Sequence, residues 1–367
     1  MAFNPEHDLA LANGDRHFIA PKSIREMACD LAPLLKVINC NHSIVWGWDA
    51  AIKEQLLRRK IPFDMLPSDV ALVALRTHSG RKTAHHILQT LRSGTSNNFY
   101  EGESYIIRHI DEIDDYAVKH QHIILKDPLS SSGKGLRHIN TNDGWNKAKE
   151  WANALIRRHG YLTAEPFYHK EQDFAMEFYA TGNQCHFIGY SLFTTNNHGR
   201  YDGNILLPDE QIEIFLSQYV HCAALHELQA WIINHRHLII PSEWDTTLFP
   251  LHFGIDMMII KAKDSTYKIH PCVEINLRLN MGIIAHEAAR QYLAPEVKGL
   301  FKIAFFPDSQ HLLRFHEEQK ERFPAKFQED RLVKGYLPLT PISKETKHHA
   351  YIICTEASEA PFAKFST

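Results

Sequence analysis

Polar residues at alternate positions mark the stretch VEINLRLNMG, which spans residues 273–282. In a strand, alternate side chains point to the same face, so Glu274, Asn276, Arg278 and Asn280 would form one row. Carboxylate and amide oxygens suit a hard cation such as Mg²⁺, and an arginine beside them suits a phosphate group. An ordinary amphipathic strand would be served equally well by Lys, Thr or Gln. The pattern therefore favours a metal and phosphate site.

Asp256 is the one acidic residue in the apolar run GIDMMIIKA, at residues 254–262. Burying a lone carboxylate is costly unless it is paired or bound to a metal. The polar turn KDST separates this run from the strand-like segment YKIHPCVEINLR, and this order predicts a hairpin. Across the hairpin Asp256 could face Glu274, and a shared cation would relieve their repulsion.

The stretch LKDPLSSSGKGLRHI, at residues 125–139, is rich in serine, glycine and lysine and lies between two strand-like runs. It does not fit a Walker A loop, because Pro128 stands at the first glycine position, Gly135 stands at the hydroxyl position, and a strand follows. The spacing of a Rossmann fingerprint is absent too. Two interpretations stay open for the loop alone: a flap that offers N–H groups, hydroxyls and Lys134 to phosphates, or a flexible polar hairpin. The metal-ligand row downstream favours the flap.

Two further polar clusters could contribute to a substrate site. The cluster FNPEHD, at residues 3–8, follows what could be the first strand, and ligands of open α/β sheets bind beyond strand ends. The loop TTNNHGRYDGN, at residues 194–204, contains His198 and Arg200, which could hold an anionic substrate. An ordinary polar loop is the alternative for each cluster.

The elements that would position these residues alternate between strands and helices. HSIVWGW (42–48) and PFDML (62–66) have the pattern of strands, and Asp49 is placed to cap the helix between them. Beyond a loop-like segment at 93–104, strand-like runs flank the serine-rich loop, and residues 140–160 have helical periodicity. This order predicts an α/β fold.

Composition sets the outer limits. The chain has 367 residues and a net charge of −3, and 44% of its residues are hydrophobic, which is typical of a globular protein of two or three lobes. No global field attracts nucleic acid or anionic lipid, and no run approaches the ~18 apolar residues of a membrane span. Isolated cysteines and the absence of a signal-peptide pattern predict a cytoplasmic protein. No pattern indicates an oligomeric state.

Four motifs in this order resemble the ATP-grasp superfamily over roughly residues 105–304. Lys126 matches the family's strand lysine, residues 130–135 its phosphate loop, EPFYHKEQDF its adenine hinge, and Asp256 with EINLR its metal-binding strands. Leu277 stands where the family commonly has proline, and Asp256 where it has glutamate. The resemblance implies that the nucleotide is bound by Lys126, Ser130, Ser131, Ser132, Gly133, Lys134, Gly135, Glu165, Pro166, Tyr168 and Asp173.

The resemblance also implies a role for each of these groups. Glu165 would lie near the adenine amine, the Pro166 carbonyl would accept from that amine, and the Tyr168 N–H would donate to the ring. Asp173 would bind the ribose. The metal would be held by Asp256, Glu274 and Asn276, and Arg278 and Lys134 would act on the transferring phosphoryl group.

The fold implied is an ATP-grasp α/β fold, with a Rossmann-like α/β lobe at 1–104, an ATP-grasp domain of two lobes at 105–304 and a C-terminal extension at 305–367. The expected activity is that of an ADP-producing ligase dependent on Mg²⁺ or Mn²⁺. It would form an acyl phosphate from ATP and a small-molecule or peptide carboxylate, for attack by an amine. A phosphotransferase on the same scaffold and a nucleotide-binding protein without catalysis are the alternatives.

Overall fold

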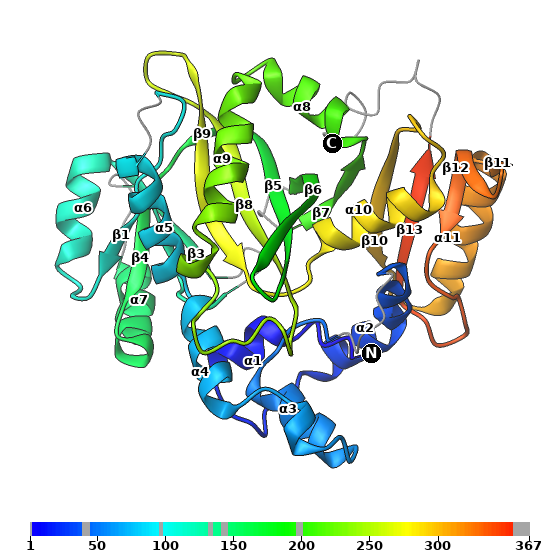
Figure 1. Cartoon of the computed structure of the whole chain (residues 1–367), viewed down its shortest axis with the longest axis horizontal. Coiled ribbons are helices and arrows are strands. Elements are labelled where there is room, and N and C mark those ends of the chain that lie inside the picture. The colour runs from blue at the N-terminus through cyan, green and yellow to red at the C-terminus, as the bar shows by residue number, and fades with distance from the viewer. Residues whose placement is uncertain are drawn as a thin grey trace.

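The computed structural model describes residues 2–38, 45–94, 98–130, 135–140, 146–195 and 201–354. A small sheet, a large sheet and a group of N-terminal helices below them make up these residues (Figure 1). The expected α/β class is confirmed. No helix in the described ranges is both long and apolar enough to cross a membrane.

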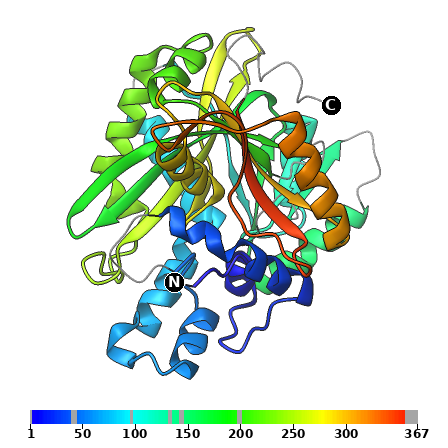
Figure 2. The same cartoon turned by 90° about the vertical axis from the view of Figure 1, so that its right-hand side faces the viewer.

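The N-terminal part is mainly helical. Its helices α1 to α4 lie under the sheets, whereas α5 lies beside them (Figures 1 and 2). Its elements are α1 (His7–Asn13), α2 (Lys22–Leu31), η1 (Ala32–Val37), α3 (Ala50–Arg58), η2 (Phe63–Met65), α4 (Asp69–His78) and α5 (Arg81–Gly94). The expected cap of α3 is confirmed, because the Asp49 carboxylate accepts from the Ile52 N–H at 2.8 Å.

The sequence prediction of a small Rossmann-like sheet in this part is wrong for the described residues. Residues 63–65 of the expected strand form a 3₁₀ turn. Phe63 and Met65 are both largely exposed, and only Leu66 at the end of the run is buried. Residues 42–44 of the other expected strand lie outside the described residues. Val45 forms only an isolated parallel bridge with Ala2.

The small sheet has four antiparallel strands in the order β1-β4-β2-β3. These are β1 (Tyr105–Ile107), β4 (Leu162–Pro166), β2 (His122–Lys126) and β3 (Leu136–Asn140). Helices α6 (Glu112–His120) and α7 (Asn146–His159) cover one face through a common apolar core. The strand-to-strand setting predicted for the serine-rich loop is confirmed, since β2 and β3 pair directly.

The large sheet has nine strands in the order β11-β12-β13-β10-β7-β6-β5-β8-β9. They are β5 (His169–Thr181), β6 (Gln184–Thr195), β7 (Tyr201–Leu206), β8 (Leu251–Lys261), β9 (Tyr267–Asn276), β10 (Gly299–Phe305), β11 (Lys326–Gln328), β12 (Arg331–Pro338) and β13 (His348–Cys354). The last three belong to the predicted C-terminal extension, and they continue the sheet rather than leaving it.

Helices cover both faces of the large sheet. On one side lie α8 (Asp209–Ser217), α9 (Cys222–Asn234) and the short η3 (Arg236–Leu238), while α10 (Met281–Tyr292) packs on β6 and β7 and α11 (Ser309–Arg322) on β12. The main core includes the fully buried rings of Phe174, Phe178 and Phe253. Helix α5 packs on β9 and contributes Leu88 and Leu91 to this core, which fixes the start of α5 beside the β8–β9 hairpin.

Candidate functional site

The β8–β9 hairpin brings the predicted metal ligands together. The two strands are antiparallel, with Asp256 opposite Glu274 and Gly254 opposite Asn276. The Asn276 side-chain amide donates to Asp256 Oδ1 at 3.2 Å. Two carboxylates and one amide oxygen therefore stand on neighbouring strands, and we call Asp256, Glu274 and Asn276 the carboxylate cluster.

The electrostatics of the carboxylate cluster favour a cation. Burial and the neighbouring charge of Glu274 together raise the pKa of Asp256 to about 7, against the opposing charge of Arg278. A site that disfavours two adjacent negative charges is stabilised when a cation joins them. In the part of the chain that the structure describes, no group of three His, Cys, Asp or Glu side chains is arranged around a metal position. Two carboxylates with an amide oxygen still fit Mg²⁺, which takes few protein ligands and completes its shell with water and phosphate.

The predicted row of side chains on one strand is wrong beyond Asn276, because β9 ends there and Asn280 caps α10. Arg278 lies in the connection between them, and it is held in place by a residue from the other end of the chain. Its guanidinium donates twice to the Asp8 carboxylate, at 3.0 Å to Oδ1 and 2.7 Å to Oδ2. A bidentate pair of this kind fixes the plane of the guanidinium. Asp8 belongs to the polar cluster at residues 3–8, so the N-terminal segment reaches the site. A cavity of about 20 Å³, roughly one water or ion, is lined by Asp8, Ser130, Glu274 and Arg278 among others.

Arg81, at the start of α5, was not singled out by the sequence. Its guanidinium donates to Glu274 Oε2 at 3.1 Å, to the Val273 carbonyl at 3.3 Å and to the Asp127 carbonyl at 3.1 Å. The Arg81 side chain is only 8% exposed. One side chain thus ties the end of β2 to β9, which fixes the small sheet against the carboxylate cluster.

Lys126 and Glu165 form an ion pair between the neighbouring strands β2 and β4. The two side chains are 5% and 7% exposed. Burial lowers the pKa of Lys126, Glu165 opposes this shift, and the charge of Arg81 adds to it. A buried lysine beside an arginine needs a negative partner, and Glu165 supplies it.

The predicted adenine hinge lies where β4 passes into β5. Pro166 ends β4, and the Tyr168 hydroxyl accepts from the Glu103 N–H at 2.7 Å. The ring of Tyr168 lies edge-on to the buried His270 of β9, with 5.5 Å between centroids. The hinge therefore lies against the strand that carries Glu274.

Asp173, the predicted ribose ligand, lies on β5 opposite Met258, two residues beyond Asp256. It forms an ion pair with Lys170 and accepts from the Thr195 hydroxyl at 3.3 Å. Burial raises the pKa of Asp173, while Lys170 lowers it. Both partners are polar groups that a ribose hydroxyl could replace.

Several predicted site residues cannot be placed. Ser131, Ser132, Gly133 and Lys134 of the loop, and the substrate candidates His198 and Arg200, lie outside the described residues. The two ends of the serine-rich loop are described. They are joined by a backbone hydrogen bond of 2.8 Å from the Asp127 N–H to the Gly135 carbonyl, so the loop starts and ends beside Arg81.

Glu177 is a further acidic residue that the sequence did not single out. It lies on β5 opposite Gly254, on the same face as Asp256. Burial raises its pKa to about 8, and the Asn280 amide donates to its Oε2 at 2.7 Å and opposes this shift. Glu177 is the one acidic residue in the apolar run FAMEFYA, at residues 174–180, so it could have been singled out in the same way as Asp256. Its partners could not be found in this way, because the pairing of β5 with β8 decides what faces it.

Comparisons with known proteins come from solved structures. This chain is similar to carboxyaminoimidazole ribonucleotide synthase from Aspergillus clavatus complexed with ATP, with 13% identity over 77% of this chain and 70% of that chain and a TM-score of 0.45. It is also similar to N5-carboxyaminoimidazole synthetase from Staphylococcus aureus complexed with ADP, with 14% identity over 82% of this chain and 72% of that chain and a TM-score of 0.45. A third similar structure is a biotin carboxylase ATP complex from Campylobacter jejuni, with 12% identity over 84% of this chain and 70% of that chain and a TM-score of 0.49. No family model and no curated protein matches the sequence. At these values, the function of this chain rests on its own residues.

Proposed function

We propose that the chain is an ATP-grasp enzyme: an ADP-producing ligase that activates a carboxylate as an acyl phosphate for attack by an amine. The observation that carries this proposal is the carboxylate cluster with two largely buried guanidinium groups fixed beside it, Arg81 and Arg278. Hard-cation ligands next to arginines are what a transferring phosphoryl group requires.

The proposed chemistry assigns one task to each group. Asp256, Glu274 and Asn276 would hold Mg²⁺ or Mn²⁺, which neutralises charge on the phosphates when bound. Arg278, whose orientation Asp8 fixes, would hold the γ-phosphoryl group and then the acyl phosphate. Arg81 would fix Glu274 and the base of the phosphate loop. No side-chain nucleophile is required, because the substrate carboxylate attacks the phosphorus directly.

Nucleotide binding would use the groups between the two sheets. Lys126 would exchange part of its pairing with Glu165 for a phosphate oxygen, and Glu165 would then be free to accept from the adenine amine. The Pro166 carbonyl and the Tyr168 N–H would complete the contacts to the base, and Asp173 those to the ribose. The loop from Ser130 to Gly135, including Ser131, Ser132, Gly133 and Lys134, would cover the phosphates and exclude water.

The wider setting is part of the same proposal. We place the enzyme in the cytoplasm, with small-molecule or peptide carboxylates and amines as substrates, and with His198 and Arg200 as candidates for binding an anionic one. We keep the division into 1–104, 105–304 and 305–367, with β11, β12 and β13 of the last part extending the large sheet of the second.

The test is ATP turnover in the presence of pooled amino acids and small carboxylates, with and without Mg²⁺. Free phosphate with ADP means a ligase, and a stable phosphorylated product means a phosphotransferase. We expect the Glu274→Ala/Asn276→Ala double variant to lose at least about 100-fold in turnover. The matched control is Asp264→Asn, which changes an exposed acid in the turn of the same hairpin and should keep wild-type ATP turnover. Full ATP turnover in the double variant would refute the metal assignment. If the wild type turns over no ATP with any pool of substrates, the ligase proposal is refuted in favour of a nucleotide-binding protein without catalysis.

A further inference from the structure

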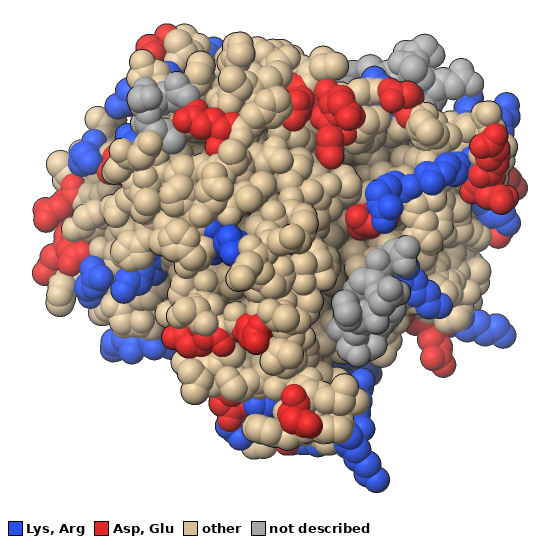
Figure 3. Space-filling model, viewed as in Figure 1, with Lys and Arg blue, Asp and Glu red and all other residues tan. Residues whose placement is uncertain are grey.

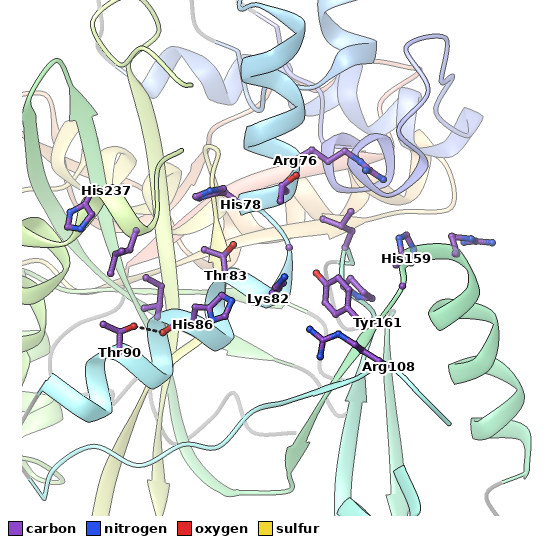
Figure 4. Close-up of a pocket in the computed structure, with 18 residues that line it drawn as sticks. Arg76, His78, Lys82, Thr83, His86, Thr90, Arg108, His159, Tyr161 and His237 are labelled. Carbon is purple, nitrogen blue, oxygen red and sulfur yellow. Dashed lines mark hydrogen bonds between the residues drawn. The ribbon is translucent and has the colours of Figure 1, made fainter. Parts of the chain in front are cut away.

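A hollow of about 840 Å³ lies beside α5, and no residue of the carboxylate cluster lines it. Side chains enter it from the ends of α4 and α7, from α5, and from the starts and ends of strands in the small sheet (Figure 4). Its size is within the range of small-molecule sites. We call this cavity the outer hollow.

The lining of the outer hollow is strongly one-sided in charge. It includes Arg76, Lys82, Arg108 and Arg158 and four histidines, and none of its 18 lining residues is Asp or Glu. The chain as a whole carries more acidic than basic residues, 43 against 40. The positive lining is therefore local, and an anion in the hollow would meet no carboxylate on its walls.

Three of the cations are available to a ligand. Within the described ranges, the side chains of Lys82, Arg108 and Arg158 form no ion pair, and all three are exposed. Arg76 differs, because its guanidinium donates to the Leu11 carbonyl at 2.5 Å and so holds α1 against α4. These three cations come from different parts of the fold and line one hollow. They can therefore contact a bound anion from several sides, which cations on a flat surface could not do.

Neutral donors complete the lining. Figure 4 shows Lys82, Thr83 and His86 projecting from α5 towards the side from which Arg108 and Tyr161 enter. Burial raises the pKa of Tyr161, so its hydroxyl keeps its proton and can donate. Guanidinium groups together with hydroxyl donors match the oxygens of a phosphate.

We propose that the outer hollow binds a small molecule carrying two or more phosphate groups, at a site separate from the carboxylate cluster. The concave shape favours such a ligand over a nucleic acid or an acidic protein surface. An extended basic tract is also missing from the face seen in Figure 3, where basic and acidic residues are interspersed.

The two sites share structural elements. Arg81 faces Glu274, whereas its neighbour Lys82 lines the outer hollow. The Arg81 N–H donates to the Pro128 carbonyl at 3.1 Å, and Pro128 also lines the hollow. Leu129 lines both the hollow and the small cavity beside the carboxylate cluster. A ligand in the hollow would therefore contact the base of the serine-rich loop.

Isothermal titration with inorganic tripolyphosphate, in buffered ~0.15 M salt, tests the proposal. We expect Lys82→Gln/Arg108→Gln to weaken binding by about 100-fold, since each residue contributes a charge-assisted hydrogen bond. Lys147→Gln/Arg157→Gln is the matched control: it removes two exposed cations of α7 that lie outside the lining, and it should bind like the wild type. All four positions are exposed, so thermal unfolding should show that both variants fold.

Two results would overturn the proposal. One is that wild-type protein does not bind tripolyphosphate, and the other is that the two double variants bind it equally well. A crystal soaked with tungstate distinguishes the site directly, because its anomalous peak should lie within contact of Lys82 and Arg108. A single peak beside Arg278 would assign the anion to the carboxylate cluster instead. None of these readouts requires ATP turnover, so they stand or fall separately from the proposed ligase activity.

Discussion

Glu177 is fully enclosed between the large sheet and the start of α10, and its charge state is coupled to folding. Asn280 caps α10 and at the same time donates to Glu177 Oε2. Three charged groups act on Glu177: Asp256 raises its pKa, and His286 and Arg278 lower it. Replacing Glu177 with glutamine keeps the carbonyl acceptor for Asn280 and removes only the titration.

The size of the effect follows from linkage. Burial raises the pKa of Glu177 from 4.5 to about 8. Between these two values the folded protein holds a proton that the unfolded chain has released, so the free energy of unfolding falls as the pH rises. The loss is about 1.4 kcal/mol for each pH unit and at most about 5 kcal/mol in total. Stability from this group is complete below pH ~4.5 and lost by pH ~8.

The assay is urea unfolding of wild type and Glu177→Gln from pH 5 to pH 8.5, in buffer with EDTA so that no metal binds Asp256. Groups that do not interact with Glu177 cancel in the difference. We expect the free energy of unfolding of Glu177→Gln to match that of the wild type near pH 5 and to exceed it by several kcal/mol at pH 8. Glu318→Gln, an exposed glutamate on α11, should follow the wild type throughout.

Parallel pH profiles for wild type and Glu177→Gln would refute this reasoning. They would mean that Glu177 is ionised in the folded protein across the whole range, and hence that water or a cation reaches it. This holds even if the two parallel profiles differ by a constant free energy of unfolding, because a difference that does not change with pH reports packing and not the binding of a proton.

Three other substitutions have expected costs, each measured by chemical unfolding at pH 7. Lys126→Met should lower stability by about 3–5 kcal/mol because it leaves Glu165 buried without its partner; adding Glu165→Gln should restore most of the loss, and a double variant no better than the single one would contradict the pairing. Phe253→Ala should cost about 3–5 kcal/mol, since the fully buried ring stacks on Phe178 at 5.1 Å. Ser68→Ala should cost about 1 kcal/mol, because the Ser68 hydroxyl accepts from the Ala71 N–H at the start of α4.

Local patterns predicted those parts of the fold whose partners lie nearby in the chain. The β8–β9 hairpin and the β2–β3 hairpin each follow from two apolar runs around a polar turn, and α7 follows from its helical period. The segment at 62–66 failed because its apolar residues alternate like those of a strand, yet no strand lies beside them. Alternation shows that a strand could form, and only a partner makes it form.

For the candidate site too, only the residues that lie close together in the sequence could be predicted. Glu274 and Asn276 share one strand, and Asp256 lies across a short turn, so spacing alone could group them. The two arginine contacts could not be found in this way: Arg278 and Asp8 are 270 residues apart, and Arg81 and Glu274 are 193 apart. Such pairs depend on how whole elements pack, and a single sequence carries no local trace of that.

Arg81 and Lys82 show how one helix can serve two sites. Successive residues of an α-helix point about 100° apart, so neighbouring cations at the start of α5 can face different sides of it. Burial of Leu88 and Leu91 against β9 sets the rotation of the helix, and this rotation turns Arg81 inward to Glu274 and Lys82 outward to the hollow. The apolar face of α5 therefore sets the direction in which Arg81 and Lys82 point. A substitution at Leu88 or Leu91 would alter the carboxylate cluster and the outer hollow together, although it changes no charged residue.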